Sequence, residues 1–210
     1  MTVTENTSAR LIKAEMHRVH NTPAGIVSEY ADGGFLWQTL SFSAGTEDVL
    51  HVQKAKVCYV IPIVGSVKVI DNKATELIAH AEETLQLSEG VYRIKNLLEY
   101  DRTNLLIVWL DVAASYEIIS SKAAVPLVQK NTLVQCSNFC HSVQLGFFDS
   151  RTKCSLELLS TSKNVLAYVV NGSFELEERL LEYRDVLVMQ GYSKIEFESL
   201  SENAIIILIT

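Results

Sequence analysis

The sequence lacks the features of a membrane-spanning or exported protein. Its longest apolar runs, Leu105–Leu110 and Ala204–Ile209, are far shorter than the roughly 20 residues that a spanning helix needs. The first residues, MTVTENTSARLIK, have neither the basic start nor the apolar stretch of a secretory signal. We therefore expect a cytoplasmic protein without a membrane segment, in which the apolar runs are buried strands.

Basic residues are outnumbered by acidic ones. The chain has 18 Lys and Arg against 25 Asp and Glu, which gives a formal net charge of −7 and a pI near 5.3. Binding to a phosphate backbone depends on clustered Lys and Arg. The charge balance therefore argues against nucleic acid as a direct ligand.

Cysteine is scarce, with Cys58, Cys136, Cys140 and Cys154 as its only occurrences. Thiols stay reduced in the cytoplasm, so we expect no structural disulfide. Cys136, Cys140 and His141 could begin a zinc site, but such a site takes four ligands and Cys154 is the only later candidate. We therefore favour the interpretation that they are small, partly buried residues.

Common catalytic motifs are missing as well. Neither a Gly-x-Ser-x-Gly turn nor a glycine-rich nucleotide loop occurs. A nucleophilic Ser or Cys also needs an activating base and a turn that stabilises an oxyanion. The sequence gives little support to these reaction classes, and we assign no catalytic residue.

Hydrophobic residues are abundant. They make up 48% of the chain and come in short bursts of β-branched and aromatic residues separated by polar turns. The segment Lys194–Glu198 alternates polar and apolar residues, as a strand with one solvent-exposed face does. Many short strands at close spacing predict an all-β sandwich or barrel.

An internal sequence repeat suggests that the fold is duplicated. The segment Tyr59–Val69 resembles Tyr168–Leu176, since each is a strand, a glycine turn and a return strand. Each half then has an acidic turn, a further strand and a closing aliphatic strand. We therefore predict two barrels. The expected boundaries are a tail over 1–10, a first barrel over 11–113, a linker over 114–130 and a second barrel over 131–210.

This order of elements resembles the pirin family and the related quercetinase-like bicupins, roughly from Leu11 to the C-terminus. The pattern is clearest over Leu166–Ile209, and its framework recurs in Cys58–Ile70 and Glu82–Gly90. The resemblance implies two tandem cupin-like barrels, that is, double-stranded β-helices of the jelly-roll type.

The resemblance also implies a metal site whose ligands are mostly missing here. Metal-binding members hold one ion in the first barrel with His-x-His, a carboxylate a few residues later and a further histidine. The matching stretch offers His51, then Gln53, with Ala55 or Val57 at the carboxylate position, and Leu87–Asn96 contains no histidine. We therefore predict a degenerate site without a cofactor. A divalent Fe, Ni, Cu or Zn ion belongs only to the alternative in which the chain is an enzyme.

The residues that could line a pocket in the mouth of the first barrel are His51, Gln53, Tyr59, Tyr92 and Arg93. The favoured hypothesis is a non-catalytic module that binds a small apolar or aromatic molecule or another protein. One alternative is a quercetinase-like dioxygenase with an atypical metal site around His51. A second alternative is a partner of a regulatory protein.

Overall fold

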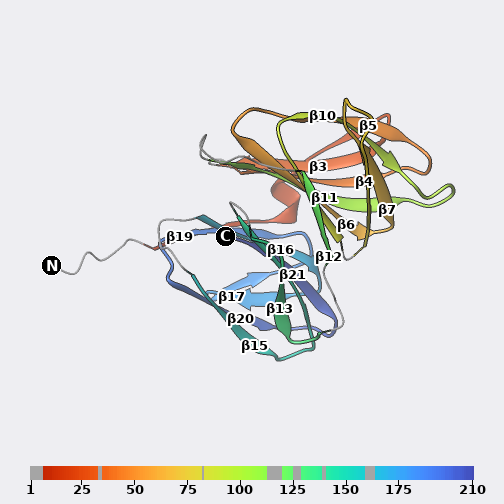
Figure 1. Cartoon of the computed structure of the whole chain (residues 1–210). Helices are drawn as coiled ribbons and strands as arrows, with labels where there is room; N and C mark the ends of the chain where they lie inside the picture. Colours follow the sequence, from red (N-terminus) through yellow and green to blue (C-terminus); the bar gives the residue numbers. More distant parts are fainter. Residues whose placement is uncertain are drawn as a thin grey trace. The chain divides into compact units, whose positions relative to one another are not determined.

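The structure is a computed structural model that describes residues 7–32, 35–81, 83–112, 120–124, 129–138, 141–158 and 164–210. Over these residues every regular element is a strand, apart from the 3-10 helix η1 (Ala14–Met16). Within the same ranges no helix has the length and hydrophobicity to cross a membrane. The chain divides into two units, which we call the N-terminal barrel (His17–Val125) and the C-terminal barrel (Met1–Met16 with Pro126–Thr210) (Figure 1).

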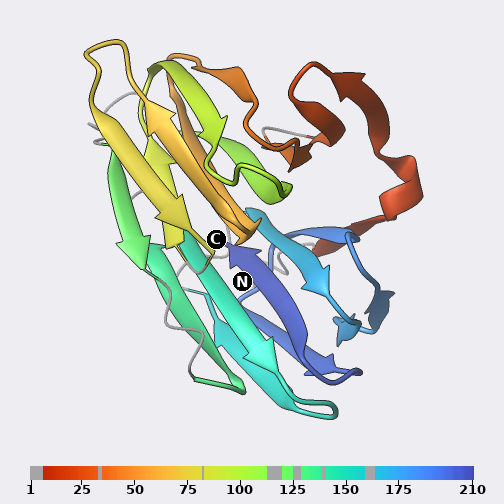
Figure 2. The same cartoon turned by 90° about the vertical axis from the view of Figure 1, so that its right-hand side faces the viewer.

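The N-terminal barrel consists of two sheets whose neighbouring strands are antiparallel (Figure 2). The seven-stranded sheet has the order β12 (Ser121–Ala124), β9 (Glu83–Leu87), β6 (Lys56–Val64), β11 (Thr103–Asp111), β4 (Phe35–Phe42), β3 (Gly25–Asp32) and β2 (Arg18–Thr22). The four-stranded sheet has the order β5 (Glu47–Val52), β10 (Gly90–Asn96), β7 (Ser66–Ile70) and β8 (Glu76–His80).

The C-terminal barrel repeats this plan. Its six-stranded sheet has the order β1 (Ser8–Ile12), β19 (Val186–Gln190), β16 (Asn164–Asn171), β21 (Ala204–Ile209), β14 (Ser142–Phe148) and β13 (Thr132–Asn138). Its four-stranded sheet has the order β15 (Lys153–Glu157), β20 (Lys194–Ser199), β17 (Phe174–Leu176) and β18 (Arg179–Leu181). The duplication that the internal sequence repeat predicted is therefore visible in the order of the strands.

Each barrel buries its own apolar core. In the N-terminal barrel, alternate residues of the four-stranded sheet, such as Val67 and Ile94, pack against residues of the larger sheet, such as Leu105. In the C-terminal barrel the core includes Phe148, Phe174 and Phe197, whose rings meet edge to face. Two separate cores explain why each half of the sequence carries a full set of apolar strands.

The barrels are bounded differently from the sequence-based expectation. Residues 8–12, expected in the tail and at the start of the first barrel, form β1 and pair with β19 of the C-terminal barrel. Strand β12, expected in the linker, pairs with β9 of the N-terminal barrel. Both are strands of four or five residues that extend the edge of a sheet, and such short segments give little local signal.

A buried carboxylate anchors the segment that follows β1. Asp185 is 2% exposed, and its carboxylate accepts hydrogen bonds from the backbone N–H of Ala14 (2.9 Å) and of Glu182 (2.9 Å). It also accepts one from Nζ of Lys13 at 2.7 Å, and this bond raises the pKa of Lys13. The acidic turn before β19 thus binds the chain segment between β1 and η1.

We predict that Asp185→Ala lowers the free energy of unfolding by roughly 2–4 kcal/mol, because buried donors lose a charged acceptor. The matched control is Glu182→Ala, since the exposed Glu182 carboxylate makes an ion pair with Lys13 at 3.3 Å and its backbone bond to Asp185 survives the substitution; its cost should stay below about 0.5 kcal/mol. Chemical denaturation followed by circular dichroism measures both. Equal costs for the two variants would contradict the anchoring role.

Gly172 follows β16 and has a φ of 76°. A Cβ atom built there would contact Ser201 Oγ and lie 3.1 Å from Ala204 Cα. We predict that Gly172→Val destabilises the fold by roughly 2–4 kcal/mol, through backbone strain plus steric overlap. Gly45→Val is the control, because φ there is 64° but no atom lies within 4 Å of the added Cβ. Thermal unfolding should show the smaller loss for Gly45→Val, and an unchanged melting temperature for Gly172→Val would refute the prediction.

Candidate functional site

The strand that carries His51 points this side chain away from the barrel interior. Along β5 the residues alternate, so that Leu50 and Val52 are buried in the core whereas His51 is exposed. Its Cα partner on the neighbouring strand β10 is Val91, which is also exposed. The histidine of the expected motif therefore lies on the outer face of the four-stranded sheet.

The other four predicted pocket residues are not brought together either. Gln53 is exposed in the turn after β5, and Arg93 is exposed on the outer face of β10. Tyr92 points into the core. Tyr59 on β6 is fully buried, but its neighbours Cys58 and Val60 belong to the core, so Tyr59 points to the opposite face of that sheet. The expected lining fails because adjacent residues of a strand face opposite ways.

The donors in the interior of the N-terminal barrel do not fit a divalent metal. The inward positions of β5 and β10 hold Asp48, Leu50, Val52, Tyr92, Ile94 and Asn96. The Asn96 amide is already occupied by hydrogen bonds, among them those to the carbonyls of Phe42 and Ser43, which leaves the Asp48 carboxylate and the Tyr92 hydroxyl as oxygen donors. Of the two residues expected at the carboxylate position, Ala55 lies in an exposed turn and Val57 is buried. Across the described ranges no three His, Cys, Asp or Glu side chains are grouped so that they could hold an ion.

Hydroxyl groups cluster where Tyr92 reaches the end of the core. The Tyr92 hydroxyl donates to the carbonyl of Ser88 at 3.0 Å and lies 3.2 Å from Oγ of Ser120. The Ser88 and Ser120 Oγ atoms are 3.2 Å apart, and the backbone N–H of Ser88 also donates to Ser120 Oγ. These groups form hydrogen bonds with one another, and the bonds connect the segment at Ser120 to Tyr92 of β10.

The possible zinc cluster is only partly described. Cys136 is buried on β13, and its Sγ lies 3.5 Å from the carbonyl oxygen of Val134. Cys140 lies outside the described residues, and His141 is partly exposed. Elsewhere, burial raises the pKa of the Cys58 and Cys154 thiols, so both are protonated at neutral pH and are weak nucleophiles and ligands.

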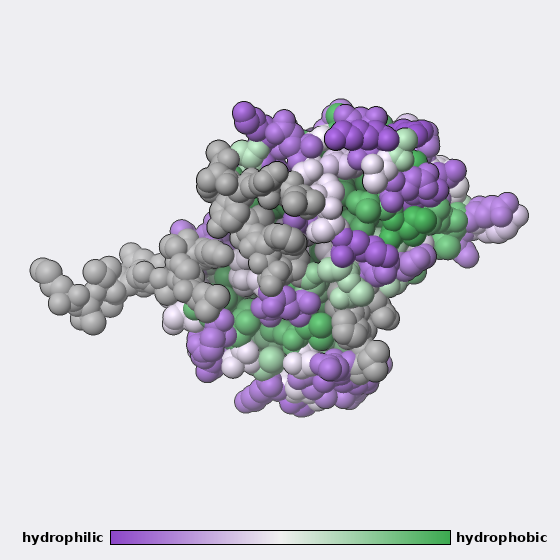
Figure 3. Space-filling model, in the orientation of Figure 1, coloured by the Kyte–Doolittle hydropathy of each residue, from purple (hydrophilic) through white to green (hydrophobic). Residues whose placement is uncertain are grey.

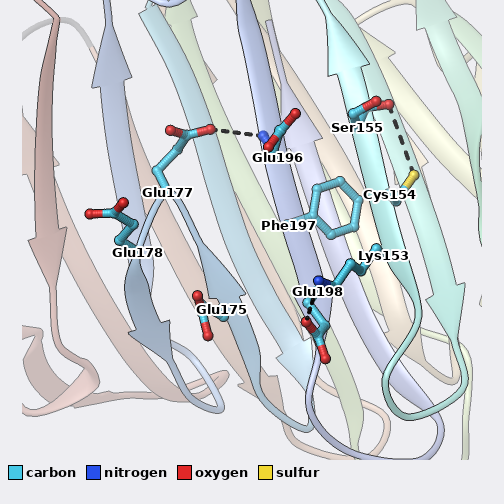
Figure 4. A pocket seen from close by; sticks show the side chains of 9 residues that line it. All are labelled: Lys153, Cys154, Ser155, Glu175, Glu177, Glu178, Glu196, Phe197 and Glu198. Atoms are coloured by element: carbon cyan, nitrogen blue, oxygen red, sulfur yellow. Dashed lines mark hydrogen bonds and ion pairs between the residues drawn. The ribbon is translucent and has the colours of Figure 1, made fainter.

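A groove on the outer face of the C-terminal four-stranded sheet was not anticipated. It has a volume of about 470 Å³ and lies over β15, β20 and β17 (Figure 4). Among the described residues its lining includes Glu175, Glu177, Glu178, Glu196 and Glu198, with Lys153 as the only basic residue. The acidic run Glu175–Arg179 forms most of β17, the turn after it and the start of β18. The missed signal was the second set of glutamates on the neighbouring strand β20.

Contacts inside this groove leave it strongly negative. The carboxylate of Glu177 accepts a hydrogen bond from the backbone N–H of Glu196 at 2.7 Å. Glu198 makes long ion pairs with the exposed side chains of Arg151 (3.6 Å) and Lys153 (3.7 Å). The side-chain hydrogen bond from Lys194 lowers the pKa of Glu196, so this glutamate stays ionised at neutral pH.

Comparison with known proteins gives structural likeness without sequence likeness. No family model matches the chain, and no curated protein matches it. Among solved structures, the bacterial pirin YhhW from Escherichia coli, in complex with nickel(II), has a TM-score of 0.77 and 12% identity, covering 96% of this chain and 98% of that one. A quercetin 2,3-dioxygenase from Acinetobacter baumannii has a TM-score of 0.73 and 11% identity, covering 96% and 78%.

These comparisons establish the fold. A third structure, an oxalate decarboxylase from Bacillus subtilis, has a TM-score of 0.70 and 12% identity and covers 95% of this chain and 76% of that one. The likeness extends over both barrels, since it covers 96% of this chain. The predicted all-β fold of two tandem cupin barrels is confirmed.

We predict that Tyr92→Phe lowers the free energy of unfolding by about 1 kcal/mol, because the hydroxyls of Ser88 and Ser120 lose a shared partner. Tyr100→Phe is the matched control, since Tyr100 is 84% exposed. Urea titration should leave the control unchanged within about 0.5 kcal/mol. A Tyr92→Phe variant as stable as the control would show that the hydroxyl cluster contributes nothing.

Proposed function

We propose that this chain is a pirin-like bicupin without an intact metal site, and that it acts as a non-catalytic binding module. The observation that carries the proposal is the inward face of β5, where Leu50 and Val52 occupy the interior and His51 lies outside. A metal ion needs several converging lone pairs, which aliphatic side chains do not supply. The nickel-bound pirin shares the fold, but the buried inward positions of β5 in this chain carry the aliphatic side chains of Leu50 and Val52.

A protein partner fits the surface better than a small molecule fits the interior. The interior of the N-terminal barrel is filled by its core, which includes Tyr92. Its surface carries exposed apolar side chains, including Val49 and Val91, which are each 48% exposed on neighbouring strands. Figure 3 also shows hydrophobic side chains ringed by hydrophilic ones where Figure 1 labels β4 and β7. Apolar groups rimmed by polar ones are typical of interaction surfaces. A small apolar or aromatic ligand and a regulatory partner both remain hypotheses.

The alternative is a dioxygenase that resembles the quercetin 2,3-dioxygenase in more than fold. It would have to build its metal site around His51, whose strand neighbours Leu50 and Val52 offer no donor. Arg93 and Lys95 add positive charge on the outer face of the adjacent strand β10, which raises the electrostatic cost of a cation there. The alternative predicts bound metal and turnover of a flavonol with oxygen, and both can be measured.

We expect protein purified without chelator to carry well under one equivalent of iron, nickel, copper or zinc by elemental analysis. His51→Ala should leave this content unchanged, as should the control His80→Ala, which removes another exposed histidine. Aerobic incubation with quercetin should consume no substrate above the buffer rate. Stoichiometric metal that is lost in His51→Ala and kept in His80→Ala would replace this proposal with the dioxygenase.

A further inference from the structure

The four-stranded sheets of the two barrels are equivalent in order and register. The internal sequence repeat aligns Gly65–Val69 with Gly172–Leu176, so β7 and β17 are equivalent strands of the two barrels. Each of these strands pairs with one long neighbour, β10 or β20, which in turn pairs with β5 or β15. Positions on the outer faces of the two sheets can therefore be compared one by one.

Equivalent positions on these outer faces carry opposite charges. On the central strands, Arg93 and Lys95 of β10 correspond to Glu196 and Glu198 of β20. The reversal extends across the whole sheet in one row of directly opposed residues. The row is Glu47, Lys95, Lys68 and Ile78 in the N-terminal barrel, and Lys153, Glu198, Glu175 and Leu180 in the C-terminal barrel.

Each row places like charges side by side. Lys95 lies directly opposite Lys68, and Glu198 lies directly opposite Glu175. Like charges in opposed positions destabilise a sheet. Lys68 is paired with Glu76 at 2.8 Å, but within the described residues neither Lys95 nor Glu175 has an ion pair. Each face therefore holds a charge that a partner of opposite sign would stabilise.

Both faces also offer apolar surface next to the charges. Val49 and Val91 are exposed beside Arg93 and His51, and Ile78 ends the row of the N-terminal barrel. Leu180, which ends the row of the C-terminal barrel, is 51% exposed. When sheets stack face to face at about 10 Å, their side chains interdigitate, so these apolar ends can pack while the charged residues pair.

We propose that the outer face of β5, β10, β7 and β8 binds the outer face of β15, β20, β17 and β18 in a second copy of this chain. The two central lysines of one row then meet the two central glutamates of the other, whether the two rows run in the same or in opposite directions. This pairing stabilises the charges that repel one another within each sheet. The contact is heterologous, so it builds rings or open chains. This inference rests on the proposed function as a binding module and names its partner.

The test uses charge reversal on one face at a time. The first variant combines Lys68→Glu with Lys95→Glu and makes both faces acidic. The second combines Glu175→Lys with Glu198→Lys and makes both faces basic. Sedimentation velocity over a dilution series should show that wild-type protein associates and that each variant alone binds itself at least about tenfold more weakly. An equal mixture of the two variants should associate again.

Matched controls change the same charges away from the rows. Lys73→Glu with Arg102→Glu controls the first variant, and Glu89→Lys with Glu202→Lys controls the second; all four residues are exposed. Both controls should associate like the wild type. Raising salt from about 0.1 M to about 1 M, which shortens the Debye length from about 10 Å to about 3 Å, should weaken wild-type association. Should a reversed variant fail to fold, Lys95→Gln or Glu175→Gln takes its place and should also weaken association.

Monomeric wild-type protein at the lower salt, or a mixture of the reversed variants that does not associate, would overturn the inference. Repeating the sedimentation series with a chelator tests the self-binding surface independently of the proposed function. If metal-free protein fails to associate, the self-binding surface is rejected and the proposed non-catalytic module stands. If the protein carries stoichiometric metal and still associates, the self-binding surface stands and the proposed function is rejected.

Discussion

The two-residue period of the β-strand decides what each barrel can do. Because neighbouring residues face opposite sides of a sheet, a single step along β5 separates a core position from a surface position. Leu50 and Val52 take the inward positions, and the only histidine of the strand is left outside. The same alternation places Arg93 outside and Tyr92 inside on β10. The buried interior of the N-terminal barrel is therefore a largely apolar core, whereas Arg93 and Lys95 of this sheet face solvent.

The N-terminal segment shows how a short strand is held where its own sequence is weak. Strand β1 adds to the edge of β19, and Ile12 at its end is fully buried. Backbone pairing alone leaves such a strand prone to fraying, since edge strands have one free side. The carboxylate of Asp185 adds hydrogen bonds from Lys13 and Ala14 directly after the strand. Burial on one side and a charged acceptor on the other together hold this segment.

The sequence predicted the fold well and the site poorly, for physical reasons. Strands such as Lys194–Glu198 are evident from their alternation, and the duplicated glycine turns indicate two barrels. Strand β1 escaped notice because its pairing with β19 joins residues far apart in the chain. The pocket at His51 and Arg93 was predicted from residue types without the phase of the strands, and a shift of one residue reverses every side chain. The acidic groove needed the register of β17 with β20, which no local pattern contains.

A duplicated fold gives two faces of similar shape, so charge is the property left to distinguish them. If both faces carried the same charges, each face would repel the same face of another copy and also the equivalent face of the other barrel. With Lys95 and Lys68 on one face and Glu198 and Glu175 on the other, basic faces repel basic faces and acidic faces repel acidic ones. Only the unlike pair attracts. The formal net charge of −7 acts in the same sense, because it disfavours unspecific association and leaves binding to local complementarity. The strand alternation that fills the interior with apolar side chains also presents these charges outward.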